Sequence, residues 1–229
     1  MTELQKKIAT RGQWHVTIRP DTFSSDRIPD VLELEPILRR TQVTGRFGFP
    51  LLPRNAQTRL LLDHISYEQE HAHVLESWAF FKSGLFTNFS GLIDDWRSDA
   101  WWTPPPDWKP GTQLELLSTL GRFLEIFQLA ASLALSPFAT GRTVIESRIV
   151  GLRNRSLWLQ SPRRMGFYPD QYRCDIPDFP RSATFETLEL QARHRELAIE
   201  WAMELFRMFR LTIEKTGMQD LANEVLPRR

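Results

Sequence analysis

Four ionisable side chains in one short segment have the chemistry of a transition-metal site. His64, Glu68 and His71 are spaced to share one face of a helix, whereas His71 and His73 would share one face of a strand. Either arrangement could place two imidazoles near a carboxylate, as such sites require. The spacing matches no strong metal motif, and a solvated polar edge is the simpler interpretation. We therefore predict no metal site, and keep these four residues as the candidates that a metal-dependent hydrolase or nuclease would use.

The single cysteine, Cys174, limits the thiol chemistry of the chain. One cysteine excludes an internal disulfide and a cluster of thiolate ligands. A nucleophilic role would need a base nearby in space, and His194 is the nearest histidine in the sequence. Lone cysteines are more often small apolar core residues, and the sequence has neither a nucleophile elbow nor a glycine-rich phosphate loop. We predict no catalytic residue and no cofactor, and the balance favours a protein that is not an enzyme.

Two adjacent carboxylates, Asp94 and Asp95, form a second candidate group. In a strand they would point to opposite faces and could not act on one substrate atom. In a turn they could cap a backbone amide or bind a cation, and we expect capping or solvation.

The charge of the chain is balanced overall but unevenly distributed. The formal net charge of +1 excludes a whole-chain field that would attract nucleic acid or a membrane. Residues 63–115 carry nine acidic and three basic side chains, a net of −6, and residues 142–173 carry seven basic and two acidic side chains, a net of +5. We rank mutual neutralisation of the two segments within the fold first, a protein interface second and nucleic-acid binding third.

Tryptophan and arginine gather in two segments that could contact another macromolecule. Both residue types are frequent anchors of protein interfaces, and arginines among aromatic side chains also suit phosphate contacts and base stacking. Three consecutive prolines favour an extended path for residues 94–111, which hold too many tryptophans for a simple flexible linker. The predicted interaction residues are Trp96, Trp101, Trp102, Trp108, Arg153, Arg155, Arg163 and Arg164.

The pattern of apolar residues predicts an α+β protein. Strands are expected where apolar and polar residues alternate, and helices where apolar residues recur with a period of 3.6. We expect strands over 13–19, 43–49, 142–150 and 157–159, a hairpin over 77–89, helices over 34–40, from 112 and over 184–216 with Gly217 as C-cap, and irregular chain over 94–111 and 163–181. Ser66 and Gln69 imitate a capping box, so 66–82 could instead be helical, but its aromatic content favours strands. The expected fold is an antiparallel or mixed sheet covered by helices, with a long C-terminal amphipathic helix. It forms one domain, 1–229, whose residues 1–12 and 218–229 are loose tails.

The helix that begins near residue 112 is predicted to be buried on most sides. Thr112 and Glu115 have the spacing of a capping box. The polar residues of this helix fall on one narrow stripe, at positions 115, 118, 122, 125, 128 and 132. They also interrupt the apolar run of about 20 residues that a membrane span requires, and the first residues lack the apolar run of a signal peptide. We therefore expect no membrane contact and a cytoplasmic location.

Three short stretches resemble a known family. They are Arg46–Pro50, Glu76–Phe86 and Asp94–Arg97, and together they are similar to a region that accompanies AlbA-like, Schlafen-related DNA-binding domains in bacterial proteins. Phe47 and Gly48 stand where that region has an aromatic residue followed by aspartate. The AlbA-like domain itself is absent, so its ATP or DNA binding does not transfer. The resemblance implies an accessory module that is usually attached to an effector.

These observations give one leading hypothesis and two alternatives. The leading hypothesis is a non-enzymatic recognition or scaffolding module of the bacterial cytoplasm, which acts through a protein partner, either a second copy or an effector. The first alternative is nucleic-acid binding through the arginines of residues 142–173. The second is the metal-dependent hydrolase or nuclease.

Overall fold

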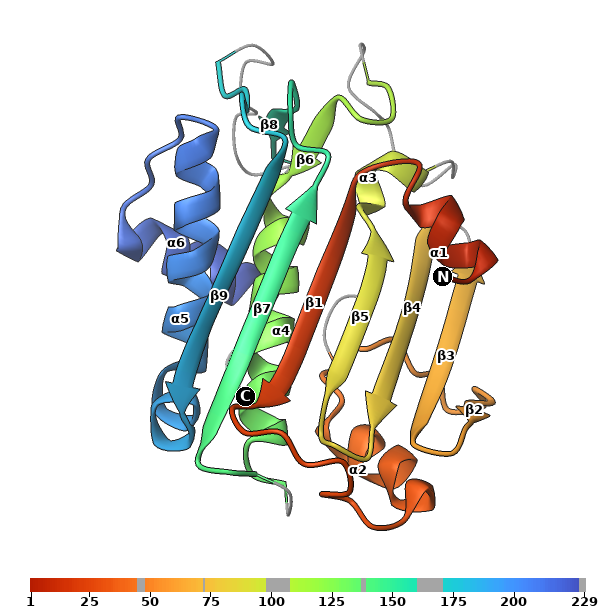
Figure 1. Cartoon of the computed structure of the whole chain (residues 1–229). Helices are drawn as coiled ribbons and strands as arrows, with labels where there is room; N and C mark the ends of the chain where they lie inside the picture. Colours follow the sequence, from red (N-terminus) through yellow and green to blue (C-terminus); the bar gives the residue numbers. More distant parts are fainter. Residues whose placement is uncertain (45–47, 72, 98–107, 137–138, 160–170, 227–229) are drawn as a thin grey trace.

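An antiparallel sheet forms the centre of the molecule in the computed structural model (Figure 1). The model describes residues 1–44, 48–71, 73–97, 108–136, 139–159 and 171–226. Within these residues seven strands pair in the order β2-β3-β4-β5-β1-β7-β9, each antiparallel to its neighbour. The strands are β1 (Gln13–Pro20), β2 (Arg59–Leu60), β3 (His64–His71), β4 (Val74–Phe81), β5 (Phe86–Gly91), β7 (Arg142–Val150) and β9 (Asp178–Glu186). Two short strands, β6 (Gln113–Glu115) and β8 (Ser156–Trp158), form a separate parallel pair. The predicted α+β class is confirmed.

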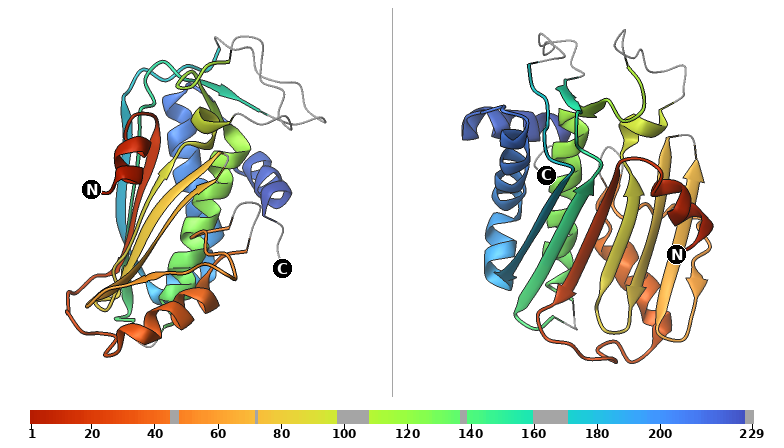
Figure 2. Two further views of the ribbon diagram at one scale, coloured as in Figure 1. Left: turned by 90° about the vertical axis from the view of Figure 1, so that its right-hand side faces the viewer. Right: turned by 45° about the horizontal axis from the view of Figure 1, so that its top comes forward.

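The helices divide unequally between the two faces of the sheet (Figure 2). One face carries α4 (Leu116–Leu133), α5 (Thr187–Met208), α6 (Lys215–Val225) and α2 (Leu34–Thr41), which follows the short 3₁₀ helix η1 (Val31–Glu33). The helix α1 (Glu3–Ile8) lies on the opposite face, beside β4 and β5. A short helix, α3 (Ile93–Trp96), follows β5.

The alternation of β1 decides which of its side chains reach the core. Trp14, Val16 and Ile18 are buried on the helix side, while His15 and Thr17 face the other way. Trp14 meets Phe123 of α4 edge-to-face, with ring centroids 5.0 Å apart. The predicted strand at 13–19 is confirmed. It is an interior strand, between β5 and β7, and its buried face packs against the helix layer.

The helix α4 is the core helix of this layer. By length and composition it could cross a membrane, but 83% of that segment is buried inside the fold, as in the core helix of a globular domain. The prediction that it is buried on most sides is confirmed. Its predicted capping box is wrong, because Glu115 is the N-cap and accepts from the Ser118 amide, whereas the Thr112 hydroxyl donates to the Lys109 carbonyl. The cytoplasmic location stays a prediction.

A buried ion pair connects three distant parts of the chain at one end of the sheet. Arg155 and Asp95 are each 1% exposed, and two guanidinium nitrogens of Arg155 donate to the two carboxylate oxygens of Asp95 at 2.8 and 2.5 Å. The carboxylate also accepts from the amides of Gly12 and Gly111. Arg155 donates further to the carbonyls of Gly151 and Gln113. Each of these contacts gives a buried polar group a hydrogen-bond partner. Without such partners, burial of these groups would destabilise the fold.

The hairpin predicted over 77–89 is confirmed by β4 and β5, and the ambiguous segment 66–82 holds the strands β3 and β4 rather than a helix. The single strand predicted over 43–49 is wrong. Val43 and Phe49 pair with each other as an isolated antiparallel bridge, so they cannot belong to one continuous strand, and 45–47 lie outside the described residues. The strands at 142–150 and 157–159 are confirmed, the second beginning one residue earlier.

The segment 163–181 was expected to be irregular, but its end forms the edge strand β9. Pro180 lies within β9, and proline is tolerated in a strand whose outer side is unpaired. The helix predicted from 184 to 216 is shorter and begins at Thr187. Arg210 has a φ of +63°, which ends the helical path after α5.

The predicted loose tails, residues 1–12 and 218–229, hold packed helices in their described parts. The helix α1 has a complete capping box at Thr2 and buries Ile8. The helix α6 buries Met218, Leu221 and Ala222 and packs on α4. Gly217 lies inside α6, so its predicted role as a C-cap is wrong.

We predict that Arg155→Leu destabilises the protein by about 3–5 kcal/mol, because it leaves the Asp95 carboxylate buried without its counter-ion. Urea unfolding followed by tryptophan fluorescence measures this change. Arg148→Leu is the matched control, because the Arg148–Asp178 pair is partly exposed and its loss should cost less than about 1 kcal/mol. Equal losses in the two variants would contradict the structural role of the buried pair.

Candidate functional site

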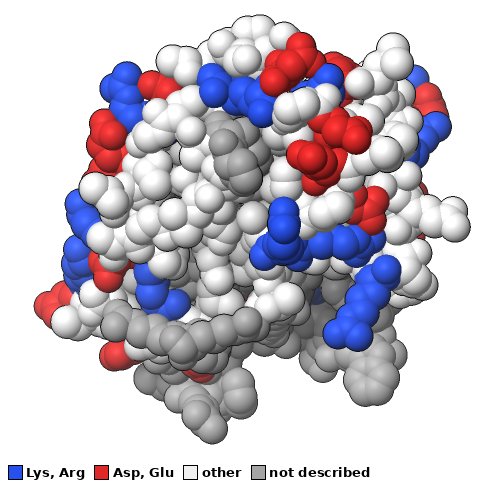
Figure 3. Space-filling view, turned by 90° about the horizontal axis from the view of Figure 1, so that it is seen from below, with Lys and Arg blue, Asp and Glu red and all other residues white. Residues whose placement is uncertain are grey.

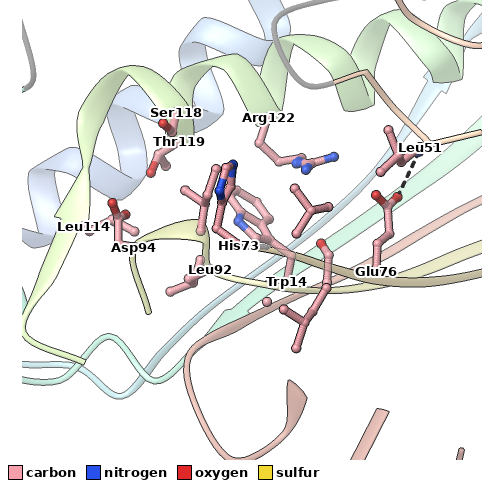
Figure 4. Close-up of a pocket in the computed structure, with 15 residues that line it drawn as sticks. Trp14, Leu51, His73, Glu76, Leu92, Asp94, Leu114, Ser118, Thr119 and Arg122 are labelled. Carbon is pink, nitrogen blue, oxygen red and sulfur yellow. Dashed lines mark hydrogen bonds between the residues drawn. The ribbon is translucent and has the colours of Figure 1, made fainter. Parts of the chain in front are cut away.

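A partly polar cavity lies between α4 and the helix-facing side of the sheet (Figure 4). Its volume is about 80 Å³. Trp14, Leu92 and Leu114 give it an apolar wall. Its polar lining side chains come from several elements: His73, Glu76, Ser90, Asp94, Ser118, Thr119 and Arg122.

The polar stripe of α4 supplies one side of this cavity. Ser118, Thr119 and Arg122 lie on successive turns of the helix and line the cavity rather than open solvent. Glu76 of β4 and Ser90 of β5 are cross-strand partners, so both side chains project from the same face of the sheet. Polar side chains of α4 therefore face polar side chains of β4 and β5 across the cavity.

Asp94 is a strongly perturbed group of the cavity. Its side chain is 2% exposed, and one oxygen, Oδ2, accepts from the Glu115 amide at 2.9 Å. The other oxygen, Oδ1, is buried and has no hydrogen-bond partner among the described residues. Burial raises the pKa of Asp94 to about 6, against the smaller lowering effects of the Glu115 amide and of Arg97.

Further polar atoms around the cavity are incompletely bonded within the described chain. The hydroxyl oxygens of Ser90 and Ser118 and the Nη1 atom of Arg122 are buried without a hydrogen-bond partner. Buried polar groups are normally hydrogen-bonded, so unpaired atoms that gather around one cavity need an explanation. A bound molecule that supplies the missing donors and acceptors is such an explanation.

The other end of the cavity holds opposite charges. Glu76 accepts from the Asn88 side-chain amide at 2.5 Å and from the Leu51 amide at 3.3 Å, and burial raises its pKa. The Arg122 guanidinium lies 3.7 Å from Glu125 and stacks over Phe49 at 5.0 Å. The guanidinium is therefore held in place by its neighbours.

Among the described residues of the cavity, no hydroxyl group is hydrogen-bonded to a side chain that could act as its base. The Thr119 hydroxyl donates to the Glu115 carbonyl, and the Ser118 hydroxyl is not bonded to any base among the described residues. Cys174 is fully buried elsewhere, and burial raises the pKa of its thiol, which opposes formation of a nucleophilic thiolate.

The structure does not bring the four metal candidates together. His64 and Glu68 lie on the open face of the sheet, and the His64 imidazole is bonded to Asp63 at 2.7 Å. His71 is exposed at the end of β3, and His73 lines the cavity on the opposite face. Among the residues that the structure describes, no group of three His, Cys, Asp or Glu side chains has metal-binding geometry.

The predicted interaction residues have different environments. Arg155 is buried, so the prediction that it contacts another macromolecule is wrong. Trp96 is half-buried and packs against Arg11, whose guanidinium carbon lies 4.3 Å from the ring centroid. Trp108 is half-buried and Arg153 is exposed. The remaining four, Trp101, Trp102, Arg163 and Arg164, lie outside the described residues.

The basic segment 142–173 is partly paired with acids of the same chain, and one of these pairs reaches the acidic segment 63–115. Mutual neutralisation of the two segments stays a prediction. The Asp95–Arg155 pair joins the acidic segment to the basic one. Arg142 pairs with Asp21, and Arg148 with Asp178. The end of the molecule that carries α2 and the β4–β5 turn shows basic and acidic side chains interspersed (Figure 3). These pairs weaken the case for an arginine surface that binds nucleic acid.

The capping role predicted for the acidic pair is confirmed, because both Asp94 and Asp95 accept from backbone amides. The predicted alternative of solvation is wrong, since both are buried. Sequence reasoning missed Glu76, Ser90 and Arg122 as cavity residues. The signal that could have found Arg122 was the polar stripe on a helix otherwise too apolar to face water.

We predict that Asp94→Asn becomes more stable relative to the wild type as pH rises. Folding raises the pKa of Asp94 from 3.8 to about 6, so the native state binds this proton more tightly, and the wild type loses stability as pH rises through that interval. This interval corresponds to about 3 kcal/mol. Asparagine can still accept from the Glu115 amide.

Urea titrations from about pH 4 to about pH 7 should therefore show the variant gaining roughly 2–3 kcal/mol on the wild type. Glu76 is present in both proteins, so its own titration cancels. The control is Asp220→Asn, at an exposed position of α6. A wild-type–variant difference that does not change with pH would show that Asp94 titrates normally.

Comparisons of the chain with protein-family models, with curated proteins and with solved structures gave no match. The function must therefore be argued from the geometry of the site itself.

Proposed function

We propose that this protein is a recognition module that binds a small, partly polar molecule in the cavity between α4 and the sheet. The observation that carries the proposal is the convergence on one cavity of buried polar atoms of Asp94, Ser90, Ser118 and Arg122 that have no hydrogen-bond partner among the described residues. Ligand sites typically combine an apolar wall with a few polar groups that fix orientation. A group of perturbed pKa in such a cavity strengthens the assignment.

The size of the cavity limits the ligand. A water molecule needs about 10–15 Å³ of such volume, so the cavity has room for roughly five to eight atoms of that size. A small metabolite or the end group of a longer molecule fits this volume. A recognition role without chemistry also agrees with the accessory module that the family resemblance implies.

We predict that a small ligand stabilises the wild type and not a variant with a filled cavity. Ser90→Val replaces the hydroxyl by two methyl groups on the cavity side of β5, where a β-branched residue suits the strand. The change narrows the cavity and removes a polar group from it. A thermal-shift survey with amines, carboxylic acids, alcohols and sugars of up to about ten non-hydrogen atoms tests this. A ligand at about 100 times its Kd should raise the Tm of the wild type by roughly 5–10 °C.

The matched control is Thr87→Val, on the same strand but on its open face. This variant should respond like the wild type. Stabilisation that is identical in Ser90→Val would place the ligand elsewhere, and no stabilising compound in the survey would refute the proposal.

An exposed run of leucines supports a protein partner as a second function. Leu60, Leu61 and Leu62 are 55%, 46% and 96% exposed, although their side chains are fully apolar. They lie at β2, which is an edge of the sheet. Apolar side chains beside a free strand edge favour association with another chain. This arrangement supports the leading hypothesis from the sequence, with the contact on β2 rather than on Arg155.

We predict that Leu60→Asp/Leu62→Asp abolishes any association of the protein, either with itself or with an effector. Light scattering after size exclusion measures the first, and a pull-down from the native host measures the second. The control is Leu188→Asp, which changes an exposed leucine at 83% exposure on α5. An association that the double variant leaves intact would place the contact elsewhere.

A further inference from the structure

We infer that the ligand of the cavity is a small amine whose ammonium group binds beside Asp94. This inference rests on the proposed function, because it names the chemical class that the same cavity takes.

The first support is the bonding of Asp94. Its Oδ2 atom is occupied by the Glu115 amide, and its Oδ1 atom is unpaired. An ionised carboxylate accepts hydrogen bonds only, so the missing partner must be a donor. The Ser118 side chain is 8% exposed with its hydroxyl unpaired, and it lies at the same end of the cavity (Figure 4). An ammonium group has three donors, so it can supply the partner that Asp94 Oδ1 and Ser118 Oγ each lack within the described residues.

The second support is the charge around the cavity. Among the described lining residues, Glu76 and Asp94 are acids and Arg122 is the permanently charged base. A further acid, Glu125, already lies 3.7 Å from the Arg122 guanidinium. An anionic ligand would increase the negative charge around the cavity, whereas a cation would decrease it. Burying a charge is favourable only when it is paired and hydrogen-bonded, and Asp94 supplies both conditions for a cation.

The third support is the shape of the remaining space. Trp14, Leu92 and Leu114 form an apolar wall, which offers no partner to a charged group. The hydrocarbon part of an amine can pack there, since its transfer from water to an apolar surface is favourable. The volume limits that part to a short chain or a small ring.

The ionisation of Asp94 should then control affinity. A cation gains most from the ionised carboxylate, and burial raises the pKa of Asp94 to about 6. Affinity should therefore fall as pH drops below that value. The charged and titratable groups near Asp94 come from four segments of the chain, and they are Glu115, Arg97, Asp95 and Arg155, together with His73, Glu76 and Arg122 of the same cavity.

Calorimetric titration of the purified protein tests this inference with three matched probe series. The probes are linear amines from propylamine to hexylamine, with the alcohols and carboxylates of the same lengths. At about pH 7.5 the best amine should bind at least tenfold more tightly than its alcohol and its carboxylate, because only the amine pairs with the carboxylate. Lowering the pH to about 5 should weaken amine binding roughly tenfold, since about a tenth of Asp94 then stays ionised.

Asp94→Asn should lose tenfold or more in amine affinity and should lose the dependence on pH. Asp220→Asn, on the exposed side of α6, should bind as the wild type does. If Asp94→Asn does not fold, the three probe series and two pH values still decide the question on the wild type alone.

The outcomes separate this inference from the proposed function. Alcohols or carboxylates that bind as tightly as amines, with binding lost in Ser90→Val, would overturn the amine and leave the cavity as a ligand site. Amine binding that persists in Asp94→Asn would overturn the inference too. The absence of cavity binding by any compound class would overturn both.

Discussion

The described structure depends on the buried pair formed by Asp95 and Arg155. Desolvation of two charges is expensive, and it is offset here because four of the five polar atoms of the pair also bond the backbone, while the Arg155 Nη2 atom, among the described residues, bonds Asp95 alone. Through those bonds, the pair fixes the start of β1, the short helix α3 and the parallel strands β6 and β8 relative to one another. The cavity residues Trp14, Asp94 and Leu114 lie on three of these segments, β1, α3 and β6.

The two neighbouring aspartates of α3 therefore differ in their hydrogen bonding. Asp95 has every acceptor site engaged and acts as structure, whereas Asp94 has one free oxygen in a cavity. The pair fixes α3, and α3 holds Asp94 in its buried position. The Asp94 carboxylate therefore remains available to a ligand. A ligand that pairs with it would offset the unfavourable free energy of burying the charge.

The sequence predicted the fold class well because alternation and helical period are strong local signals. Strand β1, the β4–β5 hairpin and the buried helix α4 were all evident from them. The signals failed where tertiary contacts override local ones. The edge strand β9 contains a proline, the helix α5 ends near Arg210 without a glycine, and α6 is ordered by its packing on α4. The cavity was less predictable, because Glu76, Ser90 and Arg122 meet only when β4, β5 and α4 are assembled.

The close contact between Gly12 and the ion pair sets a condition on a residue that has no side chain. A Cβ atom at position 12 would lie 2.2 Å from the Arg155 Nη2 atom and 2.9 Å from the Asp95 Oδ2 atom. Neither group can withdraw, since both are enclosed. Positions 95 and 155 thus restrict which residue position 12 can hold, although the three are far apart in the chain. A lineage that alters one of them is expected to alter the others as well.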